Sequence, residues 1–372
     1  MININIYLLL ILFLIIGLYI IRNEKINKSE TKMKEQFINF YKCNRYGTEK
    51  ILTKILDEYQ IKRVKSKKTD LYIPCGYTYV ERELKKIKGK NKYILAIDGC
   101  DSIVSKSGLW VTLYKKLGIN GAKKLVPETY DAKNFIEIKR FINEYQKGVK
   151  YILKKDIQAQ KGLLIRDDMN QILKDIQHGD YIVIQKLLED PFLIKGRKIN
   201  LRVYFLIVCK ENSIKGYIHS DGFLYYTKSK YKKNSLHNKH HITTGYIDRK
   251  VYEENPLTTQ DFYKWLDYNG YSSNILKNNT LHLFKSLMNC LKIPICNSKK
   301  TAKSISFQLF GCDIAPDKDL NVKLIEINKG PDLGGKDERD IALKRKVLID
   351  IFNIVGIIPN NINYKNEFIN LW

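Results

Sequence analysis

One strand near the C-terminal end restricts the possible folds of this chain most strongly. The stretch VKLIEIN, residues 322–328, carries apolar side chains on both of its alternating faces. Such a strand is usually buried, yet Glu326 and Asn328 are expected on one face together with Val322 and Leu324. Burying a charge without a partner is costly, so the strand predicts a cation or metal ion beside Glu326.

The preceding segment offers a further oxygen donor. SISFQLFGCDIA, residues 304–315, reads as a strand, and the turn-forming PDKDLN separates it from residues 322–328. In the hairpin that these strands would form, Asp313 lies across from Glu326 and Asn328. Carboxylate and amide oxygens are ligands that Mg²⁺ accepts, so the three residues form a candidate Mg²⁺ site. An ordinary turn role is the alternative for Asp313 and Asn328.

The rest of the pattern is mixed. We expect a strand over 92–99, a helix over 108–118 that ends at Gly118, and a helix over 135–148 with Phe135, Ile138, Phe141 and Ile142 at helical spacing. Strands are expected at 149–155, 181–186 and 199–208, a helix near 167–177, a hairpin around 219–223, and a final helix over 340–356 with Ile341 on its apolar face. These elements predict an α/β (α+β) chain of several lobes with antiparallel sheet.

Composition limits the function only weakly. The 372 residues carry a net charge of +26, which suits nucleic acid, anionic lipid or an acidic protein tail. A compositional bias towards Lys explains the charge equally well, because the lysines are scattered. No nucleic-acid-binding module is recognisable, so a basic nucleic-acid binder ranks last and we expect no nucleic-acid partner. The seven cysteines form no CxxC pair, and we expect buried free thiols, Cys209 among them, in a reducing compartment.

The N-terminus carries a membrane signal. Residues 6–21, IYLLLILFLIIGLYII, are apolar, and Arg22, Lys25 and Lys28 follow them. We expect residues 1–22 to form a single membrane anchor helix, with the rest of the chain on the cytoplasmic side. A buried or interfacial apolar helix is the alternative. Residues 23–36 read as a polar tether.

Two stretches could meet phosphate. YILKKDIQAQKGLLI, residues 151–165, joins two adjacent lysines to a loop with Lys161 and Gly162. Further along, Lys198, Asn200 and Arg202 alternate on one face of a strand that is otherwise apolar. A polar strand face of this kind fits a cleft better than an open surface.

At this point the chain resembles a known family. LVPETY, IQKLLEDPFLIKGRKINLRVYFLI, HITT, FGCDI and LIEINKGP occur in the order and spacing of the tubulin–tyrosine ligase family, over about residues 90–357. The resemblance implies an ATP-grasp-like fold with an N-terminal domain (37–127), a central domain (128–188) and a C-terminal domain (189–372). It also implies that ATP lies between the central and C-terminal domains.

The resemblance assigns site residues by position. Asp313, Glu326 and Asn328 match the family's Mg²⁺ ligands. The ATP-binding positions match Lys154 or Lys155, Lys161, Gly162, Gln185, Lys186, Leu187, Leu188, Lys198, Asn200, Thr243 and Thr244. Arg202 and Lys198 are the expected catalytic groups, and Lys106 matches a lysine of the N-terminal domain.

Several positions depart from the family pattern. Leu164 replaces a glycine of the phosphate loop, and Asn200 replaces an aspartate. Tyr225 stands where glutamylating members carry an arginine for the incoming amino acid, and Gly245 replaces a tyrosine. The resemblance implies an ATP-dependent ligase that joins a free amino acid to tubulin or another acidic-tailed protein. A degenerate member that only binds nucleotide or a partner is the alternative.

Overall fold

The computed structural model describes most of the chain. Its described residues are 39–42, 49–64, 69–74, 80–85, 87, 92–156, 162–211, 213–244, 247–291, 295–296, 301–359 and 363–371. The expected anchor (1–22) and tether (23–36), together with Lys161 and Gly245, lie outside these ranges. Among the described helices, none has the length and apolar character needed to span a bilayer.

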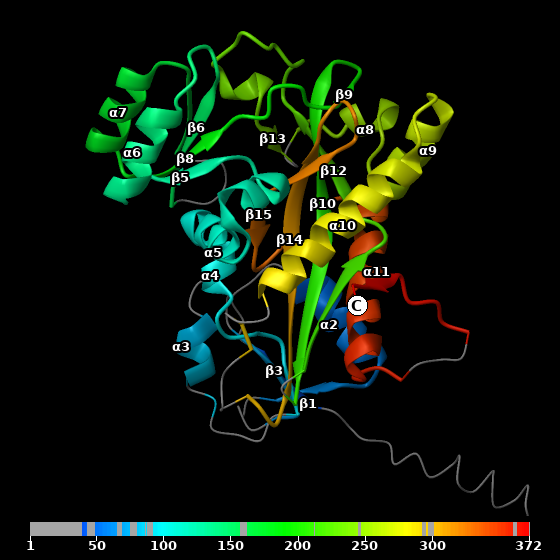
Figure 1. Ribbon diagram of the computed structural model, residues 1–372. Helices are drawn as coiled ribbons and strands as arrows, with labels where there is room; N and C mark the ends of the chain where they lie inside the picture. The colour runs from blue at the N-terminus through cyan, green and yellow to red at the C-terminus, as the bar shows by residue number, and fades with distance from the viewer. Residues whose placement is uncertain are drawn as a thin grey trace, which may run out of the picture.

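A large mixed sheet forms the centre of the molecule (Figure 1). Within the described ranges its path is β13 (Thr243–Thr244), β12 (Phe223–Thr227), β10 (Arg197–Lys210), β14 (Ile305–Pro316), β4 (Tyr93–Ile94), β3 (Leu71–Ile73), β1 (Asn39–Lys42) and β2 (Lys62–Arg63). Off this path, β9 (Leu193–Ile194) and β11 (Ser213–His219) pair with β10, β15 (Val322–Asn328) pairs with β14, and β16 (Phe368–Asn370) pairs with β11. The strands from β4 to β2 run parallel to their neighbours, whereas the β10, β14 and β15 pairs are antiparallel.

A smaller antiparallel sheet lies to one side. Its order is β5 (Thr129–Asp131), β8 (Tyr181–Lys186), β6 (Tyr151–Lys155) and β7 (Leu163–Arg166). The helices α6 (Phe135–Glu144) and α7 (Met169–His178) pack on it around Phe141, Ile172 and Ile184. Strands from residues 39–94 and from 193–370 share the large sheet, whereas the division into three domains stays a prediction.

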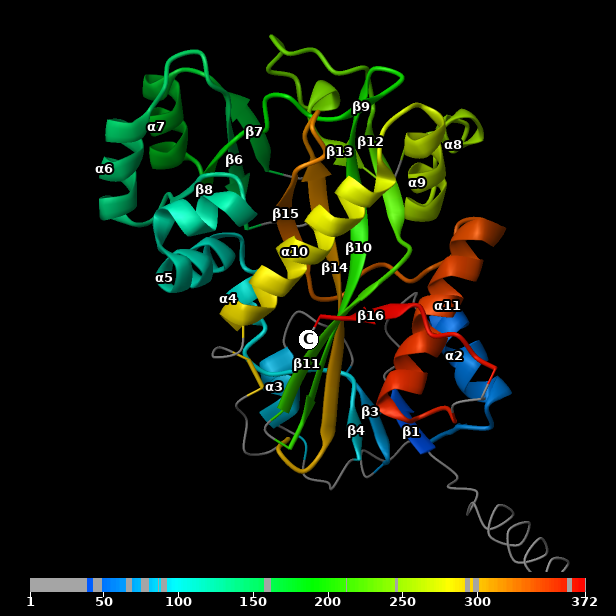
Figure 2. The same cartoon turned by 45° about the vertical axis from the view of Figure 1, so that its right-hand side comes forward.

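The remaining helices flank the large sheet. They are α2 (Glu49–Glu58), α3 (Val80–Lys85), α4 (Asp101–Val104), α5 (Lys106–Leu125), the short 3₁₀ helix η1 (Asn238–His240), α8 (Val251–Glu254), α9 (Thr259–Tyr268), α10 (Ser273–Leu291) and α11 (Glu338–Val355). In Figure 2, α10 crosses in front of β10 and β14, while α2 and α11 lie side by side. The mixed α/β class expected from the sequence is confirmed.

The two halves of β10 differ in sequence because they have different surroundings. From Val203 to Val208 every side chain is buried, because α10 and α11 cover this part of the sheet. Earlier in the strand, Ile199 and Leu201 point into the core, and Lys198, Asn200 and Arg202 point the other way. The alternation predicted from the sequence is therefore present.

Two helices differ from their predicted ends. Gly118 does interrupt its helix (φ 69°, ψ 170°), but α5 resumes beyond it to Leu125. Helix α6 ends at Glu144 rather than Gly148, because Tyr145 turns extended and its hydroxyl donates to the Asp167 carbonyl at 2.6 Å. The predicted apolar face was wrong for Phe135 and Ile142, which are 68% and 41% exposed, since α6 packs on the small sheet through Phe141. It was also wrong for Ile341 in α11, which is 41% exposed.

The hairpin expected around 219–223 is wrong. Strand β12 pairs with residues 199–202 of β10, and β11 pairs with residues 205–210 of the same strand. The Asp221 carboxylate accepts from the backbone N–H groups of Gly222 and Gln260, which holds the intervening segment against the start of α9.

The prediction of free thiols was wrong for two cysteines. Cys209 and Cys296 form a disulfide, with their Cα atoms 6.0 Å apart. The Cys296 N–H donates to the Asp98 carbonyl at 3.2 Å, and this bond holds Cys296 near the end of β10. Cys290 and Cys312 are free thiols and buried, as expected.

Candidate active site

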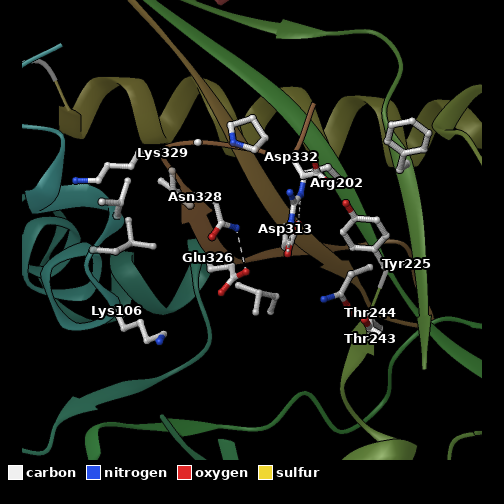
Figure 3. A pocket seen from close by; sticks show the side chains of 18 of the residues that line it. Lys106, Arg202, Tyr225, Thr243, Thr244, Asp313, Glu326, Asn328, Lys329 and Asp332 are labelled. Carbon is white, nitrogen blue, oxygen red and sulfur yellow. Dashed lines mark hydrogen bonds and ion pairs between the residues drawn. The ribbon is translucent and has the colours of Figure 1, made fainter. Parts of the chain in front are cut away.

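A cavity of about 1440 Å³ lies between the two sheets. The small sheet contributes Lys154 and Gln185, and β10 contributes Lys198, Asn200 and Arg202. Asp313 from β14, and Glu326 and Asn328 from β15, line the cavity beside them (Figure 3). Residues that are up to 174 positions apart in the chain thus line one cavity, which a sequence pattern alone does not show.

A β-bulge places the acidic residues. Asp313 pairs with Glu326, but the next residue, Ile314, pairs with Leu324, so β15 carries one extra residue. Val322 and Leu324 are therefore buried on the core side, while Glu326 and Asn328 line the cavity. The expectation that all four share one face was wrong, because a bulge re-aims the side chains beyond it.

Asp313 and Arg202 form a buried ion pair. Arg202 donates to Asp313 through Nε (2.5 Å) and Nη2 (3.0 Å), and its guanidinium lies 5.0 Å from the centre of the Tyr225 ring. A Cβ on Gly311 would lie 2.9 Å from Arg202 Nη1, so glycine makes room for the guanidinium. Burial raises the pKa of Asp313 to about 6, and the Glu326 charge adds to the rise against the opposing effect of Arg202.

Glu326 stays the more acidic carboxyl. Burial alone would raise its pKa, but the hydrogen bond from Asn328 Nδ2 (3.0 Å) and the charges of Lys154 and Arg202 lower it overall. The two carboxyls therefore differ in proton affinity although they lie on neighbouring strands. At neutral pH the site presents negative oxygen donors towards the lysines.

Two buried lysines line the same cavity as these carboxylates. Burial lowers the pKa of Lys154 to about 8, partly offset by the Glu326 charge, and burial and the Lys154 charge lower that of Lys198 to about 8. Lys154 Nζ donates to Gln185 Oε1 at 2.7 Å. Lys106 Nζ donates to the Lys155 carbonyl at 2.5 Å and also lines the cavity.

Several polar atoms in the cavity wall lack partners. Within the described part of the chain, neither the Lys198 ammonium nor Asn200 Oδ1 makes a hydrogen bond. His241 Nε2 bonds to the Ser235 carbonyl at 2.7 Å, while its buried Nδ1 is unpartnered. Buried polar groups are normally satisfied, so Asn200 Oδ1 and His241 Nδ1 point to a polar ligand.

Comparison with known proteins identifies the family. The family model for the tubulin-tyrosine ligase family matches residues 85–364. The chain belongs to the tubulin–tyrosine ligase family. This confirms the resemblance seen in the sequence.

Three relatives show how far the similarity extends. The probable tubulin polyglutamylase TTLL9 of Rattus norvegicus is 28% identical over 49% of this chain and 40% of its own length. Tubulin glycylase 3B of Drosophila melanogaster is 26% identical, over 57% of this chain and 29% of its own. Tubulin monoglutamylase TTLL4 of Homo sapiens is 24% identical, over 79% of this chain and 26% of its own length. The chain thus matches less than half the length of each.

The structure distinguishes the candidate lysines that the family resemblance left open. Lys154 lines the cavity, whereas the Lys155 ammonium lies 5.0 Å from the centre of the Tyr181 ring. Gly162 has φ +74° and its carbonyl accepts from Lys155 N–H, so it shapes the turn rather than lining the cavity. Thr243 and Thr244 do line it.

The expected adenine hinge lies along the cavity edge. Lys186, Leu187 and Leu188 line the cavity together with Gln185. The Lys186 and Leu187 N–H groups already donate to the carbonyls of Glu128 and Lys150. Across the described ranges, the Leu188 N–H has no such partner, which makes it the hinge donor best placed for a base.

Sequence reasoning missed one end of the cavity. Arg249, Lys336, Asp340 and Lys344 line it beside Tyr225. Lys344 Nζ bonds to Asp340 (3.0 Å) and to the Gly334 carbonyl (2.7 Å). The i,i+4 spacing of Asp340 and Lys344 in α11 was a signal, but only the fold brings the helix start to the cavity.

The residues present fit a magnesium-bound nucleoside triphosphate. Asp313, Glu326 and Asn328 supply only oxygen-type donors, which suits Mg²⁺ with water and phosphate completing its shell. Two carboxylates and one amide do not complete the coordination shell of a metal ion by themselves. In the described part of the chain, no group of three His, Cys, Asp or Glu side chains could hold a metal ion. Lys154 and Lys198 supply the positive charge that phosphate requires.

Proposed function

We propose that this chain is an ATP-dependent carboxylate–amine ligase with an ATP-grasp-like active site. It would add a free amino acid to a carboxylate of an acidic-tailed protein, and the C-terminal tail of tubulin is the first candidate. The observation that carries the proposal is the cavity itself. Two buried lysines from separate sheets line one cavity with two carboxylates and with the unpartnered atoms Asn200 Oδ1 and His241 Nδ1.

The reaction follows from the charges in the cavity. In the first step an oxygen of the acceptor carboxylate bonds to the γ-phosphorus of ATP, and the bond to ADP breaks, leaving an acyl phosphate. In the second, the amine nitrogen bonds to the acyl carbon, phosphate leaves and the amine loses a proton. Lys154 and Lys198 would hold the phosphates and disperse their charge. Mg²⁺ held by Asp313, Glu326 and Asn328 would supply further charge neutralisation.

The names of the relatives support the acceptor. They are described as enzymes that modify tubulin by glutamylation or glycylation. A net charge of +26 favours approach of an acidic tail. At the end of the cavity where the added amino acid would lie, Tyr225 and Arg249 line the wall, and the Arg249 guanidinium is paired with Asp337.

The test is turnover with a matched pair of variants. The full chain, given MgATP, tubulin and an amino-acid pool, should release ADP and add mass to a tubulin tail. Glu326→Gln should lower turnover by at least about 100-fold, since it removes a charge from the phosphate-facing site. Glu254→Gln, on a side chain 74% exposed, is the control. Full activity in Glu326→Gln would disprove the site assignment.

A second candidate function has one observation in its favour. Arg202 donates to Asp313 through Nε and Nη2, so its guanidinium is less free to meet a phosphate than an arginine without a carboxylate partner would be. A nucleotide-binding protein without ligase activity would bind MgATP and release no ADP with any amino acid.

A further inference from the structure

A buried hydrogen-bond chain leads away from the cavity lysine. Lys154 Nζ donates to Gln185 Oε1 (2.7 Å), and Gln185 Nε2 donates to Thr129 Oγ1 (2.9 Å). The Thr129 hydroxyl donates in turn to the Pro127 carbonyl (2.8 Å). Thr129 is 1% exposed, and Lys154 and Gln185 are each 7% exposed. Each bond is thus shielded from competing water.

The chain has only one consistent direction. A carbonyl cannot donate, so the Thr129 proton must point at Pro127 and its lone pairs must face Gln185. The Gln185 amide is then fixed with its NH₂ towards Thr129 and its oxygen towards Lys154. The reversed amide would place N–H donors against an ammonium group, which repels them. Thr129 and the ammonium therefore favour the same orientation of the Gln185 amide, and Thr129 fixes its NH₂ end.

The Thr129 backbone is anchored separately. Arg140 Nη2 donates to the Thr129 carbonyl at 2.6 Å, and Arg140 is held by Glu137 (2.9 Å) and Glu144 (3.0 Å). Its guanidinium also lies 4.0 Å from the centre of the Tyr130 ring. The start of β5 is thus fixed by a bond that does not use the hydroxyl. Removal of the hydroxyl alone should leave this anchor in place.

The type of partner matters for the charge of Lys154. Arg202 is paired with the carboxylate of Asp313, which offsets its charge, whereas Lys154 is held by a neutral amide oxygen. A neutral acceptor fixes the direction of the ammonium and leaves its full charge to an anionic ligand in the cavity.

We propose that Thr129 is a positioning residue, which orients the Gln185 amide so that the Lys154 ammonium is held, still charged, towards the phosphates of a nucleotide. The proposal rests on the proposed function for the identity of the ligand. The hydrogen-bond chain itself does not depend on that function.

The first experiment needs no nucleotide. The full chain is treated briefly with acetic anhydride, and acetylation of Lys154 is measured by mass spectrometry relative to buried Lys344. Thr129→Val should raise the relative rate of Lys154 by up to about tenfold, the value of one hydrogen bond, and Thr129→Ser should restore it. Thr280→Val is the matched control, because it removes a buried hydroxyl that has no partner within the described residues. An unchanged Lys154 rate in Thr129→Val overturns the proposal.

The second experiment separates this proposal from the proposed function. Calorimetry should show that Thr129→Val weakens MgATP binding by about tenfold and leaves adenosine binding unchanged. In a Lys154→Met background the same substitution should have no further effect. Equal losses for adenosine and ATP, or full additivity with Lys154→Met, would indicate a merely structural role and overturn the proposal. If the wild-type chain binds no MgATP while Lys154 reactivity still follows Thr129, the proposed function fails and the positioning role stands.

Discussion

At the scale of single residues, the two lysines of the cavity have different partners, and so do its two carboxylates. Lys154 has a neutral partner, and Lys198 has none among the described residues. Asp313 is paired with Arg202, and Glu326 accepts from Asn328. Each group therefore has its own proton affinity, although all of them line one cavity. Such differences commonly mark functional sites.

The lysines predict how nucleotide affinity depends on pH. Both have a pKa lowered to about 8, and a polyanion binds better to their protonated forms. MgATP affinity should therefore be nearly constant below pH 7 and fall as the pH rises through 8, by up to about tenfold per unit for each lysine. Calorimetry from pH 6.5 to 9.5 measures this.

A variant tests how much of this pH dependence of MgATP affinity comes from Lys198. Lys198→Met should weaken binding at pH 7 and flatten the decline above pH 8. Lys215→Met, on an exposed position of β11, should leave both the affinity and the slope as they are. A wild-type affinity that is constant across pH 8 would contradict the assignment of either lysine to the phosphate site.

At the scale of elements, α11 holds the last strand in place through one carboxylate. Asp350 is fully buried and accepts from His219 Nε2 (3.1 Å), Lys346 Nζ (2.7 Å), the Tyr364 hydroxyl (2.6 Å) and Glu367 N–H (3.1 Å). Burial would raise its pKa, but these bonds outweigh burial and lower it. Tyr364 and Glu367 precede β16, so the carboxylate ties the C-terminal segment to α11 and β11.

Asp350→Asn should destabilise the protein by about 3 kcal/mol at pH 7, because it breaks a buried charged network. A carboxyl whose pKa is lowered by folding stabilises the protein fully above its pKa in the unfolded chain, about 3.9. This stabilisation is lost as the pH falls through the pKa in the folded protein. The difference between wild type and variant should therefore be constant near neutral pH and shrink as the pH falls below about 3.9. Urea unfolding from pH 3 to 7 measures it.

The matched control is Asp190→Asn, a solvent-exposed carboxylate paired with Lys233. It should change the free energy of unfolding by less than about 0.5 kcal/mol. An equally small effect of Asp350→Asn at pH 7 would show that the C-terminal segment is held by its strand pairing and its apolar contacts.

At the scale of the whole molecule, we propose that residues 1–22 anchor the chain in a membrane with its active site on the cytoplasmic side. The basis is the apolar run at 6–21 followed by basic residues, and it lies outside the described ranges. The full chain should stay in the membrane pellet after alkaline carbonate extraction, and a chain that lacks residues 1–22 should not. Release of the full chain by carbonate would favour the interfacial helix.

The sequence by itself determined the class of the fold and most of the site. The alternation in β10 and the hairpin of β14 and β15 follow from local period and turn chemistry, and they already singled out Arg202, Asp313 and Glu326. The family motifs supplied the remaining candidate nucleotide positions, which stay predictions, since these motifs are short, ordered and local in sequence.

Only the tertiary structure decided how those residues meet. The bulge after Asp313 turned Val322 and Leu324 away from Glu326, and the neighbouring strand, rather than the sequence of β15, sets that register. The choice of Lys154 over Lys155, and the link from Thr129 to Lys154, depend on contacts between strands 25 or more residues apart. A period along one strand specifies which face a side chain occupies, but packing between elements specifies what that face meets.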